Sequence, residues 1–385
     1  MRKTITIGDL GTIITGKTPP TTNKNYYGDY AVFIKPTDIS EQSKYTYETE
    51  EMYSKLAAEK YENSLIPKGA ICVPCIGTIG TKMTMAPCDC YTNQSINSIV
   101  CNENYDNEYV YYLIKNFLPG LKAYNLGTAS GREYVSKSNF EKIELVAEQD
   151  KTIQKKIGEL LSRYDSLIEN YQKQIKLLEE AAQRLYKEWF VDLHFPGHEN
   201  TKIVDGVPEG WEKKTLDEYC SVFTGKKNAN AAVPLGKYKF FTCGETPLQI
   251  DSFIYDGPAI IISGNGSYTG RTTFYEGKFD LYQRTYACTI SNNDNKDMIY
   301  GLYEIVKCEL TAQISGGTHG AAIPYIVMGD VTKFTFTSND IVLRKFSKII
   351  KSFLDRTMCI SSQIHLLTEA RDRLLPKLMS GEIAV

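Results

Sequence analysis

The chain has 385 residues, of which 42% are hydrophobic and 23% charged, so it is long enough for two or three domains with buried cores. Its formal net charge is −2, which argues against indiscriminate nucleic-acid binding but leaves room for local basic loops. No apolar run reaches the roughly 18 residues of a membrane helix, and ten Cys without an export signal are typical of reduced thiols. We therefore expect a soluble, cytoplasmic protein.

Residues 1–148 predict a strand-rich globule, because short β-branched and aromatic runs such as Ala70–Gly80 alternate with Gly, Asn and Pro. Near its start, Gly11–Thr18 matches the phosphate-loop pattern GxxxxGK[ST]. Such a loop must open a helix, whereas Pro19 and Pro20 follow at once and disfavour helical geometry. We therefore interpret Lys17 as part of a surface loop, with a nucleotide site as the weaker alternative.

Residues 149–195 predict one long helix. Neither Gly nor Pro occurs between Glu159 and Phe195, and apolar residues recur at alternating steps of three and four, the a/d pattern of a coiled-coil seam. We expect the helix to end near Phe195–Gly197. The predicted seam consists of Leu161, Tyr164, Ile168, Tyr171, Ile175, Leu178, Ala182, Leu185 and Trp189.

The second half of the chain repeats the first. Residues 196–340 predict another strand-rich globule, entered through Pro208–Trp211, and residues 341–385 predict a second long helix. Each position of the first seam has a counterpart 189 positions later, as from Ile175 to Ile364, with two polar exceptions at Thr357 and Arg371. The second seam consists of Ile350, Phe353, Thr357, Ile360, Ile364, Leu367, Arg371, Leu374 and Leu378.

This internal duplication defines the expected fold class, α+β. Two similar strand-rich α/β domains would be separated by two long helices, which pair as an antiparallel coiled coil with a pseudo-twofold axis. Thr15–Lys17 recurring as Thr224–Lys226 supports the duplication outside the helices. The alternative is that each helix packs only on its own globule or pairs with a second chain.

The sequence holds few groups for catalysis. Cys72, Cys75, Cys88 and Cys90 could supply thiolates to zinc, but their spacing favours buried free thiols, so we expect no metal. The Asn/Asp-Pro-Pro-aromatic segment of amino-methyltransferases does not occur in the sequence, and no carboxylate cluster is typical of a nuclease. We therefore expect a protein that is not an enzyme.

The chain resembles the specificity (S) subunits of Type I restriction–modification systems over essentially its full length. The segments that carry the resemblance are Gly16–Pro19, Tyr26–Gly28, Ile34–Ile39, Leu178–Phe190, Pro208–Trp211 and, most specifically, Arg371–Ile383. The resemblance implies two target-recognition domains, residues 1–148 and 196–340, each reading one half of a split double-stranded DNA site. It also implies that the helices set the gap and bind two methyltransferase (M) subunits, which restriction/translocase (R) subunits join. S-adenosylmethionine, ATP and Mg would be bound by those partners and no cofactor by this chain.

Candidate DNA contacts come from loops that combine Gly with Lys, Arg, Thr, Asn or Tyr, since such side chains contact phosphates and base edges. They are Lys17, Thr18, Thr78, Ser130 and Arg132 in the first half, and Lys226, Lys227, Asn265, Tyr268, Arg271 and His319 in the second. The alternative function is a structural rod whose two ends bind proteins and have no DNA specificity.

Overall fold

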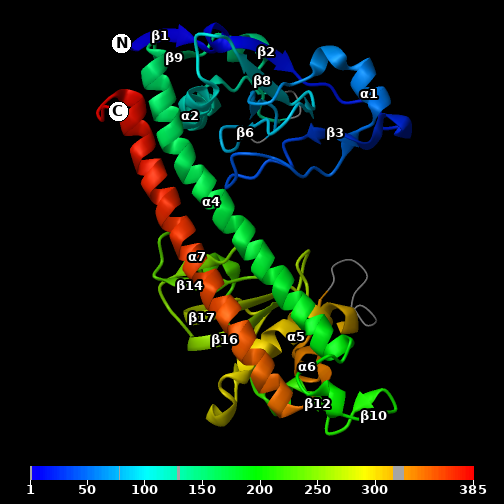
Figure 1. Ribbon diagram of the computed structural model, residues 1–385. Helices are drawn as coiled ribbons and strands as arrows, with labels where there is room; N and C mark the ends of the chain where they lie inside the picture. The colour runs from blue at the N-terminus through cyan, green and yellow to red at the C-terminus, as the bar shows by residue number, and fades with distance from the viewer. Residues whose placement is uncertain (1, 78, 128–130, 315–324) are drawn as a thin grey trace. The chain divides into compact units, whose positions relative to one another are not determined.

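The computed structural model describes residues 2–77, 79–127, 131–314 and 325–385. The chain forms two compact units: unit 1 comprises Met1–Lys173 and Ser361–Val385, and unit 2 comprises Gln174–Ile360 (Figure 1). Within these described ranges, no helix has both the length and the apolar character needed to span a membrane.

Unit 1 contains three small sheets. β1 (Arg2–Thr6) pairs antiparallel with β9 (Glu144–Glu148), so the start of the globule is joined to its end. A four-stranded sheet has the order β2–β8–β5–β6, formed by Gly11–Thr15, Ile96–Cys101, Ile71–Pro74 and Thr84–Met85. A three-stranded sheet has the order β4–β3–β7, formed by Met52–Tyr53, Tyr27–Ile34 and Tyr91–Thr92.

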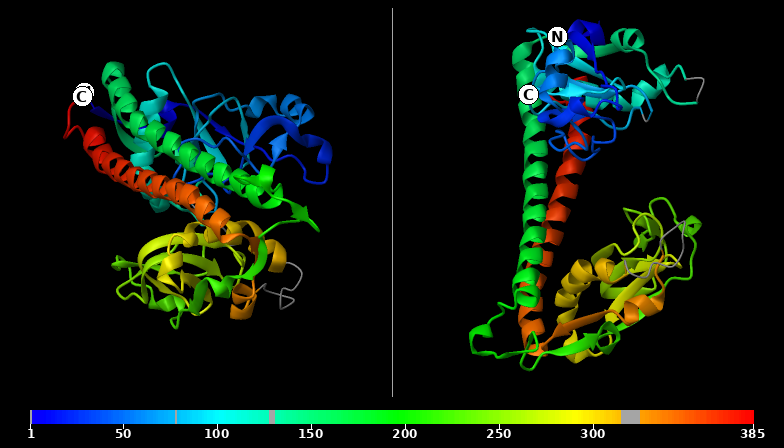
Figure 2. Two further views of the ribbon diagram at one scale, coloured as in Figure 1. Left: turned by 60° about the horizontal axis from the view of Figure 1, so that its bottom comes forward. Right: turned by 90° about the vertical axis from the view of Figure 1, so that its right-hand side faces the viewer.

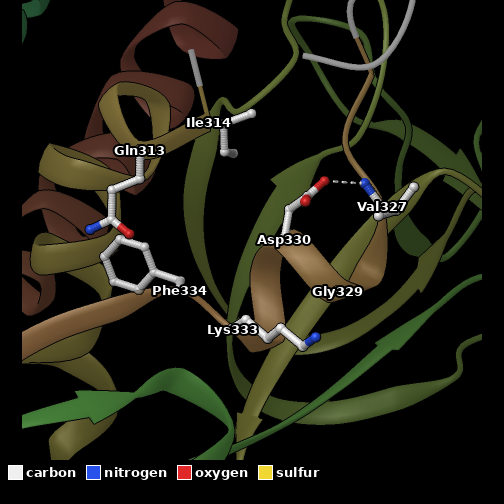
Figure 3. Close-up of a pocket in the computed structure, with 7 residues that line it drawn as sticks. All are labelled: Gln313, Ile314, Val327, Gly329, Asp330, Lys333 and Phe334. Atoms are coloured by element: carbon white, nitrogen blue, oxygen red, sulfur yellow. Dashed lines mark hydrogen bonds between the residues drawn. The ribbon is translucent and has the colours of Figure 1, made fainter. Parts of the chain in front are cut away.

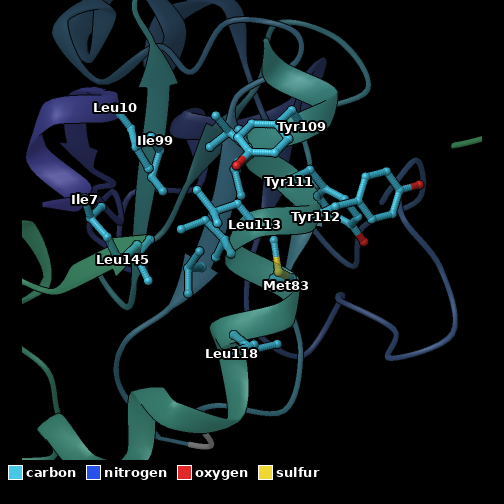
Figure 4. Close-up of a cluster of buried hydrophobic side chains, with 14 of the residues drawn as sticks. Ile7, Leu10, Met83, Ile99, Tyr109, Tyr111, Tyr112, Leu113, Leu118 and Leu145 are labelled. Carbon is cyan, nitrogen blue, oxygen red and sulfur yellow. The ribbon is translucent and has the colours of Figure 1, made fainter. Parts of the chain in front are cut away.

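Helix α2 (Asn107–Phe117) supplies much of the core of unit 1; the shorter helices are α1 (Lys55–Lys60) and α3 (Lys137–Glu141). The Asp106 side chain caps α2 by accepting a hydrogen bond from the Tyr109 amide at 3.1 Å. Leu113 on α2 lies in the same buried cluster as Ile99 of β8 and Leu145 of β9 (Figure 4). This core holds the loops at the strand ends in place.

Unit 2 contains a larger sheet with the order β13–β18–β16–β17–β14–β15. Its strands are Cys220–Thr224, Thr285–Ile290, Tyr255–Ser263, Thr272–Leu281, Tyr238–Phe241 and Leu248–Ile250. β12 (Glu212–Thr215) pairs antiparallel with β19 (Thr335–Ser338), and the hairpin β10–β11 is formed by Ile203–Val204 and Val207–Pro208. Helix α5 (Met298–Ile314) packs its buried residues into the core, and α6 (Met328–Thr332) follows.

Two long helices contribute to both units. They are α4 (Lys151–Tyr186), extended by a π-helical turn at Lys187–Val191, and α7 (Asp340–Ser380). In unit 1, Asp165 of α4 contacts Arg371 of α7, and in unit 2, the rings of Phe190 and Phe346 are 5.0 Å apart. The later α4 residue therefore meets the earlier α7 residue, so in each unit the two segments lie side by side and antiparallel (Figure 2).

The topology of the two units confirms the predicted α+β class and the internal duplication. The order β2–β8–β5–β6 in unit 1 recurs as β13–β18–β16–β17 in unit 2, and the β1–β9 pair recurs as β12–β19. One local expectation differs from the structure: the first long helix ends at Val191 rather than near Phe195. Backbone amides of Asp192 and His194 bond back to Lys187 and Glu188, which closes the π turn before the proline is reached.

Candidate nucleic-acid interface

Glycine fixes the loop that leaves the first strand of each four-stranded motif. A Cβ atom at Gly16 would lie 2.1 Å from the carbonyl oxygen of Thr92, and one at Gly225 would lie 1.7 Å from that of Leu281. Both distances are too short for any side chain, so only glycine allows this approach of two backbones. Lys17 and Lys226 follow these glycines, and both side chains are exposed.

Four segments of unit 1 meet at one edge through backbone hydrogen bonds, and we call them loop cluster 1. The Lys17 amide donates to the Thr92 carbonyl at 2.9 Å, and the Cys75 amide donates to the Ser95 carbonyl at 2.7 Å. The Cys75 carbonyl in turn accepts from the Val135 amide at 2.9 Å. Loops that begin far apart in the sequence are thereby held next to one another.

Loop cluster 1 contains the candidate contacts of the first half that the structure describes. The Thr18 hydroxyl donates a hydrogen bond to the exposed Gln94 side chain. Arg132 is exposed and precedes Glu133, whose carbonyl accepts from the Gly77 amide at 2.9 Å. Two further candidates, Thr78 and Ser130, lie outside the described residues.

The same arrangement recurs in unit 2, where we call it loop cluster 2. The Gln283 amide donates to the Lys227 carbonyl at 3.0 Å, and the Gly264 amide donates to the Arg284 carbonyl at 2.9 Å. The Gly264 carbonyl accepts from the Ile326 amide at 2.9 Å, as the Cys75 carbonyl does from Val135 in unit 1. Two of the three bonds therefore recur at equivalent positions, whereas the lysine loop accepts a bond through Lys227 in unit 2 and donates one through Lys17 in unit 1.

An isolated bridge reinforces this equivalence. Ile76 bridges Tyr134 in unit 1, and Asn265, one of the candidate contacts, bridges Tyr325 in unit 2. These residues directly follow Cys75 and Gly264 in one segment, and precede Val135 and Ile326 in the other. The two loops are therefore joined in both units by the same pair of contacts, one hydrogen bond and one adjacent β-bridge.

The candidates in loop cluster 2 differ in how their side chains are held. Lys226 is exposed, whereas the Lys227 Nζ lies 2.6 Å from a carboxylate oxygen of the buried Asp280. The Arg271 guanidinium lies over the Tyr268 ring, 5.3 Å from its centroid, and the Tyr268 hydroxyl donates to Glu245 at 3.3 Å.

His319, another candidate of the second half, lies outside the described residues. The two loop clusters also expose polar side chains that are not among the predicted DNA contacts: Gln94, Gln283 and Arg284. The 189-position shift places Gln94 opposite Gln283, which is the signal that identifies this pair.

The phosphate-loop pattern at Gly11–Thr18 lies in a different backbone context. Residues Gly11–Thr15 form β2 and pair with β8, so these amides serve the sheet rather than a phosphate. A buried proline, Pro19, follows in place of a helix. This geometry does not form the anion cradle that the pattern requires.

Two of the four cysteines considered as zinc ligands, Cys72 and Cys75, are buried neutral thiols. Burial raises the pKa of Cys72 to about 11 and that of Cys75 to about 12, so both are protonated at neutral pH. The Cys72 sulfur accepts a hydrogen bond from the Ser98 hydroxyl at 3.4 Å. Among the residues with described positions, no group of three or more His, Cys, Asp and Glu is arranged to hold a metal ion.

A cavity of about 430 Å³ in unit 2 lies beside α6 (Figure 3). Its polar groups include Asp330 and Lys333, and its walls include Phe334 and Ile314. The Asp330 carboxylate accepts a hydrogen bond from the Val327 amide at 2.7 Å, so it caps α6. One of the polar groups of the cavity, the Asp330 carboxylate, is therefore already engaged in capping the helix.

The predicted seam positions on both long helices are buried or half-buried. Thirteen large apolar side chains of the predicted coiled-coil seam are all buried or half-buried. They are Leu161, Tyr164, Ile168, Tyr171, Ile175, Leu178, Leu185, Ile350, Phe353, Ile360, Ile364, Leu367 and Leu374. In contrast, Leu177 is 60% exposed and Leu366 is 62% exposed, although each is next to a seam residue. The helices therefore keep some apolar surface for solvent or partners.

Known proteins share the sequence and the fold of this chain. A family model described as the Type I restriction modification DNA specificity domain matches residues 2–180. The Type I restriction enzyme MjaIX specificity subunit of Methanocaldococcus jannaschii is 27% identical over 407 aligned residues, which cover 98% of this chain and 93% of that protein. The Type I restriction enzyme EcoDI specificity subunit of Escherichia coli is 31% identical over 183 residues, 46% of this chain and 39% of that protein.

A solved structure extends the likeness to the fold. The crystal structure of a Type-I restriction-modification system S subunit from M. genitalium aligns with a TM-score of 0.63, covering 98% of this chain and 96% of that chain at 17% identity. Sequence and topology thus agree along the chain. The chain is similar to Type I restriction–modification specificity subunits along its length, and residues 2–180 match their DNA specificity domain.

Proposed function

We propose that this chain recognises a bipartite DNA sequence, with loop cluster 1 reading one half and loop cluster 2 reading the other. The observation that carries the proposal is the repetition of one hydrogen-bonded loop edge, with exposed basic or amide side chains in both copies. Backbone hydrogen bonds hold these loops so that side chains reach base edges, while lysines contact phosphates. Two similar edges in one chain suit a target with two specific halves.

Charge is distributed in a way that fits specific rather than general binding. The whole chain is weakly acidic, whereas Lys17, Arg132, Lys226 and Arg271 are exposed cations within the two clusters. A protein of this kind has little nonspecific affinity and depends on contacts made at its loops.

The two clusters can be tested by salt-dependent binding of duplex DNA, with methyltransferase subunits present. Replacing Lys17 and Lys226 by Ala should weaken binding and lower the slope of log affinity against log salt by about one for each phosphate that is no longer neutralised. Lys155→Ala is the matched control, because Lys155 is exposed on α4 and belongs to neither cluster. An equal loss of affinity in the control, or no salt-sensitive binding by the unaltered complex, would favour the protein-binding rod instead.

The long helices are proposed to set the gap between the two half-sites and to bind two methyltransferase subunits. Leu177 and Leu366 support the second role, because the internal duplication places them at equivalent positions and both are well exposed. Two equivalent apolar sites suit two copies of one partner. S-adenosylmethionine, ATP and Mg would be held by the methyltransferase and restriction subunits.

Docking can be tested by copurification of a tagged chain with its methyltransferase. Leu177→Asp and Leu366→Asp together should abolish the complex, and each alone should leave one bound copy. Exposed Glu159→Ala on α4 is the control. A complex that keeps two methyltransferases in the double variant would contradict this assignment.

A further inference from the structure

One polar layer interrupts the apolar seam between α4 and α7 in unit 1. Asp165 is 7% exposed and Arg371 is 6% exposed, and the Arg371 Nη1 donates to an Asp165 carboxylate oxygen. The second oxygen of Asp165 accepts a hydrogen bond from the Tyr112 hydroxyl at 2.5 Å, and the Arg371 Nε donates to Asp372 at 2.8 Å. The two buried charges are thus each other's main partners across the helices.

The duplication identifies the corresponding layer in unit 2. A shift of 189 positions maps Asp165 to Leu354 and Ala182 to Arg371. Ala182 and Leu354 belong to one hydrophobic cluster of unit 2. Within unit 2, Ala182 lies eight positions before Phe190 and Leu354 lies eight positions after Phe346, so the Phe190–Phe346 contact sets Ala182 on the side of Leu354. One layer is therefore charged and its counterpart is apolar.

This asymmetry matters because α4 and α7 carry similar seams. The α4 helix of one copy could pair antiparallel with α4 of a second copy in the register that the duplication dictates. Asp165 of each copy would then face Ala182 of the other, and keep the Tyr112 hydrogen bond but lose its cationic partner. In a pair of two α7 helices, Arg371 would likewise face Leu354, and would keep the exposed Asp372 but lose its buried partner. A buried charge without its partner is strongly disfavoured.

We propose that the Asp165–Arg371 layer selects the pairing of α4 with α7 and prevents the chain from associating with a second copy through like helices. The layer acts as a polar seam position does in coiled coils, where it specifies partner and register. Only the α4–α7 pairing satisfies both charges, whereas the other seam layers are compatible with either pairing. Helix pairing of this kind does not depend on DNA recognition.

The test uses the full chain, coexpressed as two differently tagged copies with a photocrosslinking benzoylphenylalanine in place of Tyr171. Position 171 is a half-buried seam position of α4. The unaltered chain should be monomeric and form crosslinks to α7 peptides. The double variant Asp165→Leu with Arg371→Ala copies the apolar layer of unit 2, so it should fold. We expect it to give a covalent dimer joined through two α4 peptides, at least about tenfold more abundant than in the unaltered chain.

Two further variants control this result. The charge exchange Asp165→Arg with Arg371→Asp keeps opposite charges and should stay monomeric. Arg371→Met leaves Asp165 without a cationic partner in either pairing, so the preference for α7 is lost and the α4–α4 dimer should form even where the double variant is poorly folded. Monomeric behaviour of a folded double variant and of Arg371→Met, with crosslinks to α7 alone, would overturn the proposal.

Discussion

Lys226 and Lys227 are neighbours in the sequence, yet the structure gives them different surroundings. Lys227 is held by the buried Asp280 at 2.6 Å, and Ser252 donates to the same carboxylate at 2.8 Å. A phosphate could attract Lys227 only by competing with this carboxylate. Lys226 is exposed, so under the proposed function it is the better candidate of the two for a phosphate contact.

Glu304 is a residue whose ionisation opposes folding. It lies on α5 and is 1% exposed, and burial raises the pKa of its carboxyl above the ordinary value. Its hydrogen-bond partner is the Cys308 thiol, 3.7 Å away, which is a weak donor. Counted from the start of each helix, Glu304 on α5 stands at the same place as Leu113 on α2 of unit 1, where the fold buries an apolar side chain.

We predict that Glu304→Leu stabilises the protein at neutral pH. A carboxyl with a raised folded pKa binds its proton more tightly in the folded state, so stability falls as pH rises from the unfolded pKa of about 4.5 through the folded pKa. The gain in the variant should be largest above that range and shrink towards pH 4. Thermal melting from pH 4 to pH 8 measures it, and about 1 kcal/mol corresponds to roughly 2–4 °C for a unit of this size. A gain that does not change with pH would point to packing alone.

The alternating apolar steps in the sequence predict which leucines of α4 are buried. Leu161 lies on the predicted seam and is fully buried in the core of unit 1, whereas Leu167 lies off the seam and is 47% exposed. Both are leucines on one helix of the same unit. They therefore form a matched pair for measuring the contribution of the seam.

Leu161→Ala should lower the free energy of unfolding by about 2–5 kcal/mol, because it removes buried methylene groups and leaves a cavity. Leu167→Ala should change it by less than about 0.5 kcal/mol. Denaturant unfolding of the isolated chain gives both values. Similar losses for the two variants would mean that the heptad pattern does not mark the packed face.

Local patterns in the sequence are enough for the long helices, the duplication and the α+β class, since each depends on residues a few positions apart or on repetition. They are not enough for strand order, because β2 pairs with β8 and β1 with β9 across most of the globule. The same limit applies to the site. Gly16 and Lys17 indicate a loop, but only the fold brings that loop to Thr92, and Lys227 to Asp280.

Each unit contains one complete loop cluster supported by its own core. Loop cluster 1 is built from residues of unit 1, and its core includes Ile157 and Leu161 of α4 and Leu375 and Leu378 of α7. Loop cluster 2 is built from residues of unit 2. Specificity for the two half-sites should therefore be separable, provided that the contacts of each globule with its helix segments are kept.

This separability predicts the outcome of exchanging residues 1–148 for those of another specificity subunit. Mapping of methylated bases across a genome should show a new sequence in one half of the target, with the other half and the gap between them unchanged. The donor should carry a tyrosine equivalent to Tyr112, because its hydroxyl satisfies one oxygen of the buried Asp165. The reciprocal exchange of residues 212–338 should change the other half alone. If either exchange altered both halves, the two clusters would not read independently, since a local exchange can reach the distant half-site only through a shared reading surface.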